Sequence, residues 1–255
     1  MAHYDFTNRT LVLTGANGGI GREVARVFYD CGANLFLIDR ERGALDALAA
    51  SLAGEGEGAA AARERIRTLA IDAADPDDAS RAAHEIGSAF GRVDFLVPAA
   101  GVYLAEPFAE MTDEQWRRTL SINLDGVFYL TRRVLPLLQD GGAIVNLASL
   151  AAHRGAFYNT HYSASKGALL SLTRSLAREL GPRVRVNAVS PGIIDTPMTA
   201  DLLKNRGAQT LEQTILGRFG APREVASVIA FLCSDDASFI TAEVVQVNGG
   251  LYVSG

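Results

Sequence analysis

The sequence predicts an α/β fold, a single doubly wound domain with a parallel sheet of about seven strands and helices on both faces. Short apolar runs alternate with amphipathic helical patterns along the 255 residues. The runs are apolar at consecutive positions, which indicates strands buried on both faces of a parallel sheet. Right-handed crossovers through the intervening helices then wind the sheet in two directions. We expect one domain over residues 1–255, because no linker or second core pattern divides the chain.

The elements of the first half of the chain are assigned from their apolar spacing. The first strand is TLVLT, and the helix after it places Val24, Val27 and Phe28 on one face. The helix after the third strand follows two aspartates, Asp75 and Asp77, either of which suits an N-cap. The expected strands are 10–14, 34–39, 66–71 and 93–97, and the expected helices are 21–30, 41–52 and the one that follows the third strand.

The second half continues the alternation with longer helices. The apolar run AIVNLA predicts a fifth strand. A long helix begins at Tyr162 and ends at Gly181-Pro182, because glycine and proline terminate helices. The expected strands are 143–148, 183–189 and 243–247, and the expected helices are 112–138, 162–180 and 222–233.

Two stretches lack a periodic pattern. The glycine-rich stretch 54–62 (GEGEGAAAA) predicts a flexible surface loop. Residues 190–217 form the longest irregular stretch of the chain. Irregular stretches of that length inside a compact domain usually have a function, so we expect residues 190–217 to form a substrate loop.

The charge balance argues against nucleic acid and anionic membranes as partners. The formal net charge is −5 at pH 7, and the basic residues are scattered. The one cluster, Arg63, Arg65 and Arg67, is expected on a solvated strand edge or loop rather than in a phosphate-binding patch.

Cysteine usage and the N-terminus favour a cytoplasmic protein. Cys31 and Cys233 lie far apart and lack metal-ligand spacing, so we expect reduced thiols and no metal site. Reduced thiols suit a reducing compartment. Residues 1–10 lack the apolar core of a signal peptide, and no apolar run is long enough to span a membrane.

A glycine-rich turn follows the first strand directly and opens the first helix. Such glycines let the backbone approach a pyrophosphate, while the helix N-terminus offers free N–H groups and a positive dipole end. An acidic residue, Asp39, ends the next strand at the separation expected for a group that binds ribose hydroxyls. The turn therefore predicts a dinucleotide site rather than a tight turn alone. Its residues are Gly15, Asn17, Gly18, Gly19, Ile20 and Gly21.

The acidic residue also favours NAD over NADP. The Asp39 carboxylate accepts hydrogen bonds from ribose hydroxyls and repels the 2′-phosphate of NADP. Arg40 follows it and is able to pair with that phosphate, so the choice stays open at this point. Asp72 ends the third strand, where it either meets the adenine or serves as a helix cap or turn residue.

Tyr162 and Lys166 are one helical turn apart, so they share a helix face. An ammonium beside a phenol favours phenolate, and we expect it to lower the pKa of Tyr162 toward the working pH. Tyr162 would then act as a general acid or base. Ser149, at the end of the fifth strand, is placed to hold a substrate oxygen, and Asn123 to orient Lys166 through a water or a backbone carbonyl. The alternative is a half-buried tyrosine beside a solvated lysine.

Taken together, these motifs resemble the short-chain dehydrogenase/reductase family over residues 10–250. The glycine turn resembles TGxxxGxG, and Asn123, Ser149, Tyr162 and Lys166 match the family's catalytic tetrad in order and spacing. The resemblance implies a Rossmann-type domain, a homotetramer or homodimer, and hydride transfer between a nicotinamide cofactor and a carbonyl or alcohol carbon. The further cofactor contacts that it implies are Ala73, Ala100, Gly101, Pro191, Gly192, Ile194 and Thr196.

The chain departs from the family pattern at three places. Pro98-Ala99 stands where the family has two asparagines, and we expect this change to affect stability rather than chemistry. Ala242 and Asn248 replace a common glycine and aspartate in a region that packs subunits in many members.

Mostly apolar and aromatic residues are expected to wall the substrate pocket. They favour a hydrophobic or cyclic secondary alcohol, diol or ketone as substrate. The nearest alternative is an NADPH-dependent reductase of 3-oxoacyl thioesters, and an alternative of another class is a non-catalytic NAD-binding regulatory protein. The expected wall residues are Tyr103, Leu150, His153, Phe157, Tyr158 and Met198, with Leu202 and Leu203 nearby.

Overall fold

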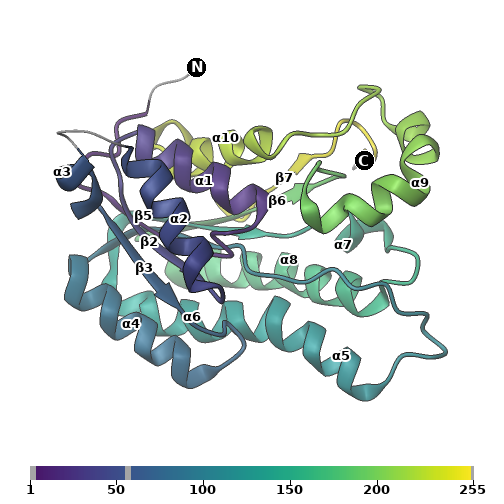
Figure 1. The fold of residues 1–255 in the computed structure, drawn as a ribbon, viewed down its shortest axis with the longest axis horizontal. Coiled ribbons are helices and arrows are strands. Elements are labelled where there is room, and N and C mark those ends of the chain that lie inside the picture. The colour runs from purple at the N-terminus through teal and green to yellow at the C-terminus, as the bar shows by residue number, and fades with distance from the viewer. Residues whose placement is uncertain (1–3, 55–58, 254–255) are drawn as a thin grey trace.

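The computed structural model of the protein describes residues 4–54 and 59–253, and it confirms the predicted fold class (Figure 1). Seven parallel strands form one sheet in the order β3-β2-β1-β4-β5-β6-β7. The winding direction reverses between β1 and β4, which is where ligands bind in doubly wound sheets. The strands are β1 (Thr10–Thr14), β2 (Asn34–Asp39), β3 (Ile66–Ala70), β4 (Val93–Pro98), β5 (Leu138–Leu147), β6 (Val184–Pro191) and β7 (Val244–Val247).

Helices cover both faces of this sheet. In Figure 1, α1, α2 and α10 lie on one side, and α4, α5, α6 and α8 lie on the other. None of the helices within the described residues is long and apolar enough to cross a membrane. The helices are α1 (Gly19–Asp30), α2 (Arg42–Ala53), α3 (Ala59–Glu64), α4 (Pro76–Phe90), α5 (Asp113–Leu120), α6 (Gly126–Val134), α7 (Ala151–Arg154), α8 (Thr160–Leu180), α9 (Ala200–Gln213) and α10 (Pro222–Cys233).

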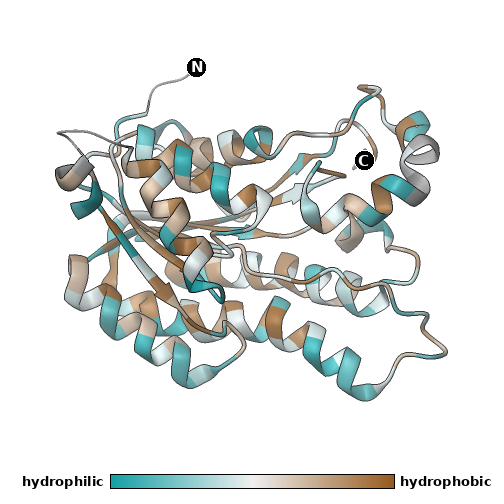
Figure 2. Cartoon of the chain, viewed as in Figure 1, coloured by the Kyte–Doolittle hydropathy of each residue, from teal (hydrophilic) through white to brown (hydrophobic). Residues whose placement is uncertain are grey.

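The core consists of two apolar layers separated by the sheet. Leu11 and Leu13 of β1 pack toward α1 and α10, whereas Val12 packs toward α4, α6 and α8. All three side chains are fully buried, as the continuous apolar run predicts. Figure 2 shows hydrophobic residues along the strands and the inward helix faces, with hydrophilic residues on the outer helix faces.

Three segments differ from the predicted elements. Residues 190–217 are not one irregular loop, because β6 extends to Pro191 and α9 occupies Ala200–Gln213. The predicted helix 112–138 is broken by a π-helical turn at Ser121–Asp125 and ends before β5, which begins at Leu138. Part of the predicted loop 54–62 belongs to α3, and residues 55–58 lie outside the described residues.

The proline at the end of β4 is tolerated because the ladder with β5 ends before it. The last register pair between β4 and β5 joins Leu96 to Ile144, whereas Pro98 is buried two residues further on, opposite Thr14 of β1. Proline is accepted in a sheet where no neighbouring strand requires its missing N–H group.

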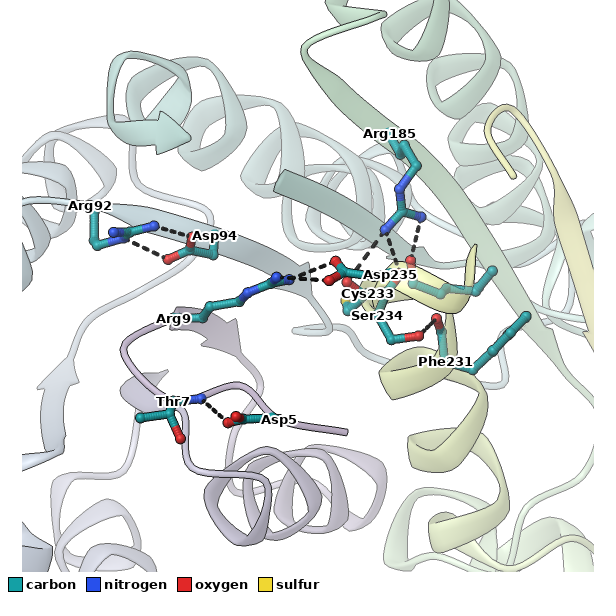
Figure 3. A network of polar contacts seen from close by, with 11 residues as sticks. Asp5, Thr7, Arg9, Arg92, Asp94, Arg185, Phe231, Cys233, Ser234 and Asp235 are labelled. Carbon is teal, nitrogen blue, oxygen red and sulfur yellow. Dashed lines mark hydrogen bonds and ion pairs between the residues drawn. The ribbon is translucent and has the colours of Figure 1, made fainter. Parts of the chain in front are cut away.

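Arginines connect the start of β1 and the middle of the sheet to the end of α10 (Figure 3). Arg9 donates to both carboxylate oxygens of Asp235, at 3.0 and 3.1 Å. Arg185 of β6 donates to the carbonyl oxygens of Leu232 and Ser234, at 2.6 and 3.1 Å. The bonds of Arg185 satisfy carbonyls at the helix end that have no partner within the helix.

Ala242, just before β7, has a left-handed backbone conformation with φ +64°. This conformation costs about 1 kcal/mol for a residue with a Cβ atom, and glycine adopts it freely. We expect Ala242→Gly to raise the free energy of unfolding by about 0.5–1 kcal/mol in urea titrations. The matched control, Ala47→Gly on the exposed face of α2, should lose about 1 kcal/mol. A loss of the same size in both variants would contradict the strain at Ala242.

Candidate active site

A cavity of about 120 Å³ lies at the carboxyl ends of β1, β2 and β4, where the sheet reverses its winding. The sequence-predicted cofactor residues that line it come from four separate segments of the chain. The structure therefore brings them into one crevice, as a doubly wound sheet requires. They are Gly15, Asp39, Arg40, Asp72, Ala73, Ala100 and Gly101.

Two glycines of the turn after β1 are required by close backbone packing. Gly15 has φ +67°, and a Cβ atom there would lie 2.7 Å from the amide nitrogen of Ala100. A Cβ atom on Gly21 would lie 2.1 Å from the carbonyl oxygen of Gly15. Helix α1 begins at Gly19 without a side-chain cap, so its first N–H groups are left for an anion. These features fit the pyrophosphate of a dinucleotide.

Asp39 ties the glycine turn to the end of β2. Its two carboxylate oxygens accept hydrogen bonds from the amides of Asn17 and Arg40, at 2.9 and 2.8 Å. An ionised carboxylate has further lone pairs, so Asp39 is still able to accept from hydroxyl groups in the crevice. Asp72 is a turn residue that accepts from the amide of Ala74 at 2.9 Å, while Asp75 is the N-cap of α4.

The remaining predicted cofactor residues follow β6 and pack against the glycine turn. A Cβ atom on Gly19 would lie 2.6 Å from the Cγ2 atom of Thr196. Ile194 is almost fully buried in the core, so its side chain supports the crevice from behind. Gly192 lies in the wall of a second, larger cavity. The segment after β6 therefore joins the glycine turn to the second cavity.

The second cavity, of about 420 Å³, contains the predicted reacting groups. Ser149 follows β5 and forms a side-chain hydrogen bond with Tyr162 in the first turn of α8. The ring of Tyr103 packs edge-on against that of Tyr162, with centroids 4.8 Å apart. Lys166 is 4% exposed, and its Nζ atom lies 5.8 Å from the centre of the Tyr162 ring. The structure therefore places these residues on one side of α8.

Asn123 occupies the π-helical turn and is fully buried. Its side chain binds the backbone N–H and C=O groups of Val102, at 2.8 and 3.0 Å, and donates to Ser165 at 3.2 Å. Lys166 instead donates to the carbonyl oxygen of Leu147 at 2.7 Å. A strand carbonyl therefore holds Lys166 directly, and orientation of Lys166 by Asn123 through a water stays a prediction.

Burial raises the pKa of Tyr162, whereas the sequence predicts that Lys166 lowers it. Desolvation raises the pKa of Tyr162 to about 12, and the hydrogen bond from Ser149 lowers it only in part. Desolvation also lowers the pKa of Lys166 to about 8. The expected lowering of the tyrosine pKa is therefore wrong for the protein without cofactor. At neutral pH the phenol is protonated and suited to donate a proton.

A hydrogen-bonding contact between His161, next to Tyr162, and Glu106 fixes the segment that carries Tyr103. The Nε2 atom of His161 lies 2.6 Å from the Oε2 atom of Glu106, and the histidine ring is fully buried. The amide of Glu106 also donates to the carbonyl oxygen of Tyr158 at 2.7 Å. These contacts join residues 101–106 to the start of α8, and the sequence offered no signal for them beyond the residue types.

The structure separates two predicted substrate residues from the others. Tyr103, Leu150, Phe157 and Met198 line the second cavity, together with Leu202.

His153 and Tyr158 are absent from its lining. His153 instead lies 3.0 Å from the Gln246 side chain and stacks on Tyr252 at 5.0 Å. The ring of Tyr158 packs on Phe157 at 4.0 Å. His153 belongs to α7, whereas Tyr158 follows α7 and has a left-handed backbone with φ +63°. A role of either residue in substrate binding stays a prediction.

Among the lining residues that the sequence analysis did not name, Arg154 and Gln213 have long polar side chains. Arg154 ends α7, five residues after Ser149, and Gln213 ends α9. Proximity to the end of β5 was a usable signal for Arg154. Gln213 lies within the predicted substrate loop 190–217, but nothing singled it out there.

A family model described as enoyl-(acyl carrier protein) reductase matches residues 15–252. The chain belongs to the short-chain dehydrogenase/reductase family. It is 36% identical to a 3-oxoacyl-(acyl-carrier-protein) reductase of Thermotoga maritima, over 96% of this chain and 98% of that one. It is 37% identical to a meso-2,3-butanediol dehydrogenase of Serratia marcescens, over 98% and 96%.

A crystal structure from Brucella melitensis, titled short-chain dehydrogenase/reductase SDR: glucose/ribitol dehydrogenase, is similar throughout. Its TM-score is 0.94 and its sequence identity 58%, and the match covers 98% of this chain and 99% of that one. This short-chain dehydrogenase/reductase is accordingly an oxidoreductase that binds a nicotinamide cofactor.

The lowered pKa of Lys166 predicts a pH dependence of stability in the cofactor-free protein. Between pH 8 and its ordinary value of 10.5, the unfolded lysine holds a proton that the folded one has released. Stability contributed by this group therefore rises with pH across that window, by about 3 kcal/mol at most. We expect the free energy of unfolding of Lys166→Met to exceed that of the wild type at pH 7, and the difference to shrink as the pH rises toward 10.

Lys204→Met on the exposed side of α9 is the matched control, and it should show no such trend. The measurement stops near pH 10 because Tyr162, with its raised pKa, contributes the opposite slope above that value. A constant difference between the wild type and Lys166→Met would contradict the lowered lysine pKa.

Proposed function

We propose that the protein is an NAD(H)-dependent dehydrogenase/reductase that interconverts a secondary alcohol or diol and its ketone. The substrate has a hydrophobic or cyclic body. The observation that carries this proposal is the pairing of Ser149 and Tyr162 in the wall of the larger cavity, next to the buried Lys166. A non-catalytic nucleotide-binding protein has no need of this arrangement.

Each group in the larger cavity has a distinct task. The Ser149 hydroxyl holds the substrate oxygen beside the Tyr162 phenol, which donates a proton in reduction and accepts one in oxidation. Lys166, fixed by Leu147, places a positive charge near the phenol and stabilises the phenolate that reduction leaves and from which oxidation begins. The nicotinamide cofactor, when bound, supplies or accepts the hydride. Asn123 keeps Val102 and the adjacent crevice wall in place.

A role of Tyr162 in proton transfer is tested by removing its hydroxyl group. We expect Tyr162→Phe to lower kcat by about 10²–10⁴-fold in assays of NADH absorbance, because proton transfer by a placed side chain contributes that much. NADH binding, measured by fluorescence, should be unchanged. Tyr129→Phe on α6, far from both cavities, is the control. A Tyr162→Phe enzyme with a near-native rate would refute the proposed mechanism.

The proposed preference for NAD rests on Asp39. Its carboxylate lines the crevice and would meet the 2′-phosphate of NADP at close range. We expect kcat/KM for NAD to exceed that for NADP by about 10²-fold, since a like-charge contact costs several kcal/mol. Asp39→Asn should shift the ratio toward NADP by about 10-fold or more, because Arg40 then meets the phosphate unopposed. Asp46→Asn, an exposed carboxylate on α2, is the control.

A 3-oxoacyl thioester reductase that uses NADPH is the second candidate function. The family description and the Thermotoga maritima relative favour it, whereas the Serratia marcescens relative favours diol chemistry. A panel of secondary alcohols, diols and acetoacetyl thioesters, each assayed with both cofactors, distinguishes the two. Higher kcat/KM for the thioester with NADPH than for any alcohol with NAD would reverse our ranking.

A further inference from the structure

Among the described residues, Arg154 is the one charged side chain in the wall of the larger cavity, and no carboxylate lines it. Leu150, Phe157, Met198 and Leu202 form an apolar part of this wall. Ser149, Tyr162, Thr199 and Gln213 supply polar groups. A cavity with a single described cation discriminates between neutral and anionic ligands.

Nothing within the described chain neutralises this cation. No ion pair or side-chain hydrogen bond joins Arg154 to another described residue, whereas Arg9, Arg92 and Arg218 each bind a carboxylate. An arginine at the wall of a pocket, without an internal partner, is free to bind an anion from outside.

Arg154 lines the same cavity as the reacting groups Ser149 and Tyr162. Arg154 ends α7, which begins two residues after Ser149, and its amide donates to the carbonyl oxygen of Leu150 at 3.3 Å. Ser149 and Arg154 line the same cavity, at the two ends of this short segment. Gln213 at the end of α9 lines the same cavity and supplies an amide donor. Figure 1 shows α7 and α9 at the same end of the molecule.

We propose that Arg154 binds a carboxylate of the substrate, so that the enzyme acts on hydroxy acids and the corresponding oxo acids. This inference rests on the proposed function and narrows its substrate class. A guanidinium fork matches a carboxylate with two parallel hydrogen bonds. One cation balances one carboxylate, whereas a phosphate dianion would leave an unpaired charge against apolar walls.

The carboxylate site does not alter the reaction proposed above at the hydroxyl-bearing carbon of the substrate. In the oxidation of a hydroxy acid, the carbinol C–H bond breaks and its hydride passes to the nicotinamide. The O–H proton passes to the phenolate form of Tyr162, and a C=O bond forms. The carboxylate keeps its charge throughout and serves to hold the substrate in position.

The test compares oxo acids with their own methyl esters. A series from acetoacetate to 5-oxohexanoate is reduced with NADH by the wild type, Arg154→Gln and Arg154→Lys. We expect the wild type to prefer the best acid over its ester by about 10–100-fold in kcat/KM, as for a charge-assisted hydrogen bond. Arg154→Gln should abolish that preference by raising KM for the acid alone, and Arg154→Lys should retain part of it. Arg178→Gln, an exposed arginine of α8 outside the cavity, should behave like the wild type.

A binding measurement separates this inference from the proposed function. Butyrate and butyramide are added to the NADH-saturated protein, and the melting temperature is recorded for the wild type and Arg154→Gln. Stabilisation by butyrate that is lost in Arg154→Gln supports the anion site even if no ketone is reduced, in which case only the proposed function fails. Reduction of neutral ketones with no preference for acids, or equal losses for acid and ester in Arg154→Gln, would overturn the carboxylate site and leave the proposed function standing.

Discussion

The hydrogen bond from Lys166 to the carbonyl oxygen of Leu147 is the interaction on which the site depends. It joins the long helix α8 to the end of the central strand β5 at 2.7 Å, inside the protein. A buried ammonium must have partners, because desolvation otherwise makes its charge costly. The end of β5 therefore fixes the position of α8 along the sheet, and α8 in turn fixes the position of Tyr162, one helical turn before Lys166. The same strand end positions Ser149, which lies two residues beyond Leu147.

The two cavities work as one site because neighbouring segments belong to both. Gly101 lines the nucleotide crevice, and two residues later Tyr103 packs on Tyr162 in the larger cavity. The contact of Glu106 with His161 joins this segment to α8. The segment after β6 packs on the glycine turn and also lines the larger cavity. Short stretches of backbone therefore connect the walls of the two cavities.

Features that depend on local periodicity, or on the close approach of backbone segments at glycines, could be predicted from the sequence. The strand TLVLT, the glycine turn and the pair Tyr162–Lys166 belong to this class, since apolar runs, positive φ and helical spacing are local properties.

The features that could not be predicted from the sequence depend on contacts between distant segments. Helix α9 has a weak apolar pattern around Gly207, so nothing marked it as a helix. The roles of His153 and Asn123 were set by Gln246 and Val102, and no local rule identifies those partners. Likewise, the pKa of Tyr162 depends on packing density around the phenol, which no residue spacing specifies.

The raised pKa of Tyr162 determines the resting state of the site. A phenol with a pKa of about 12 is fully protonated at neutral pH, while Lys166, at about 8, remains mostly charged. The site therefore rests as a proton donor beside a cation, which is the state required to reduce a carbonyl group. In the proposed oxidation the reaction begins instead from a phenolate, which a nearby positive charge favours. Arg154 lies in the cavity wall at the end of α7, and Lys166 lies 5.8 Å from the centre of the Tyr162 ring. The proposed division of tasks therefore assigns substrate binding to Arg154 and the phenol to Lys166.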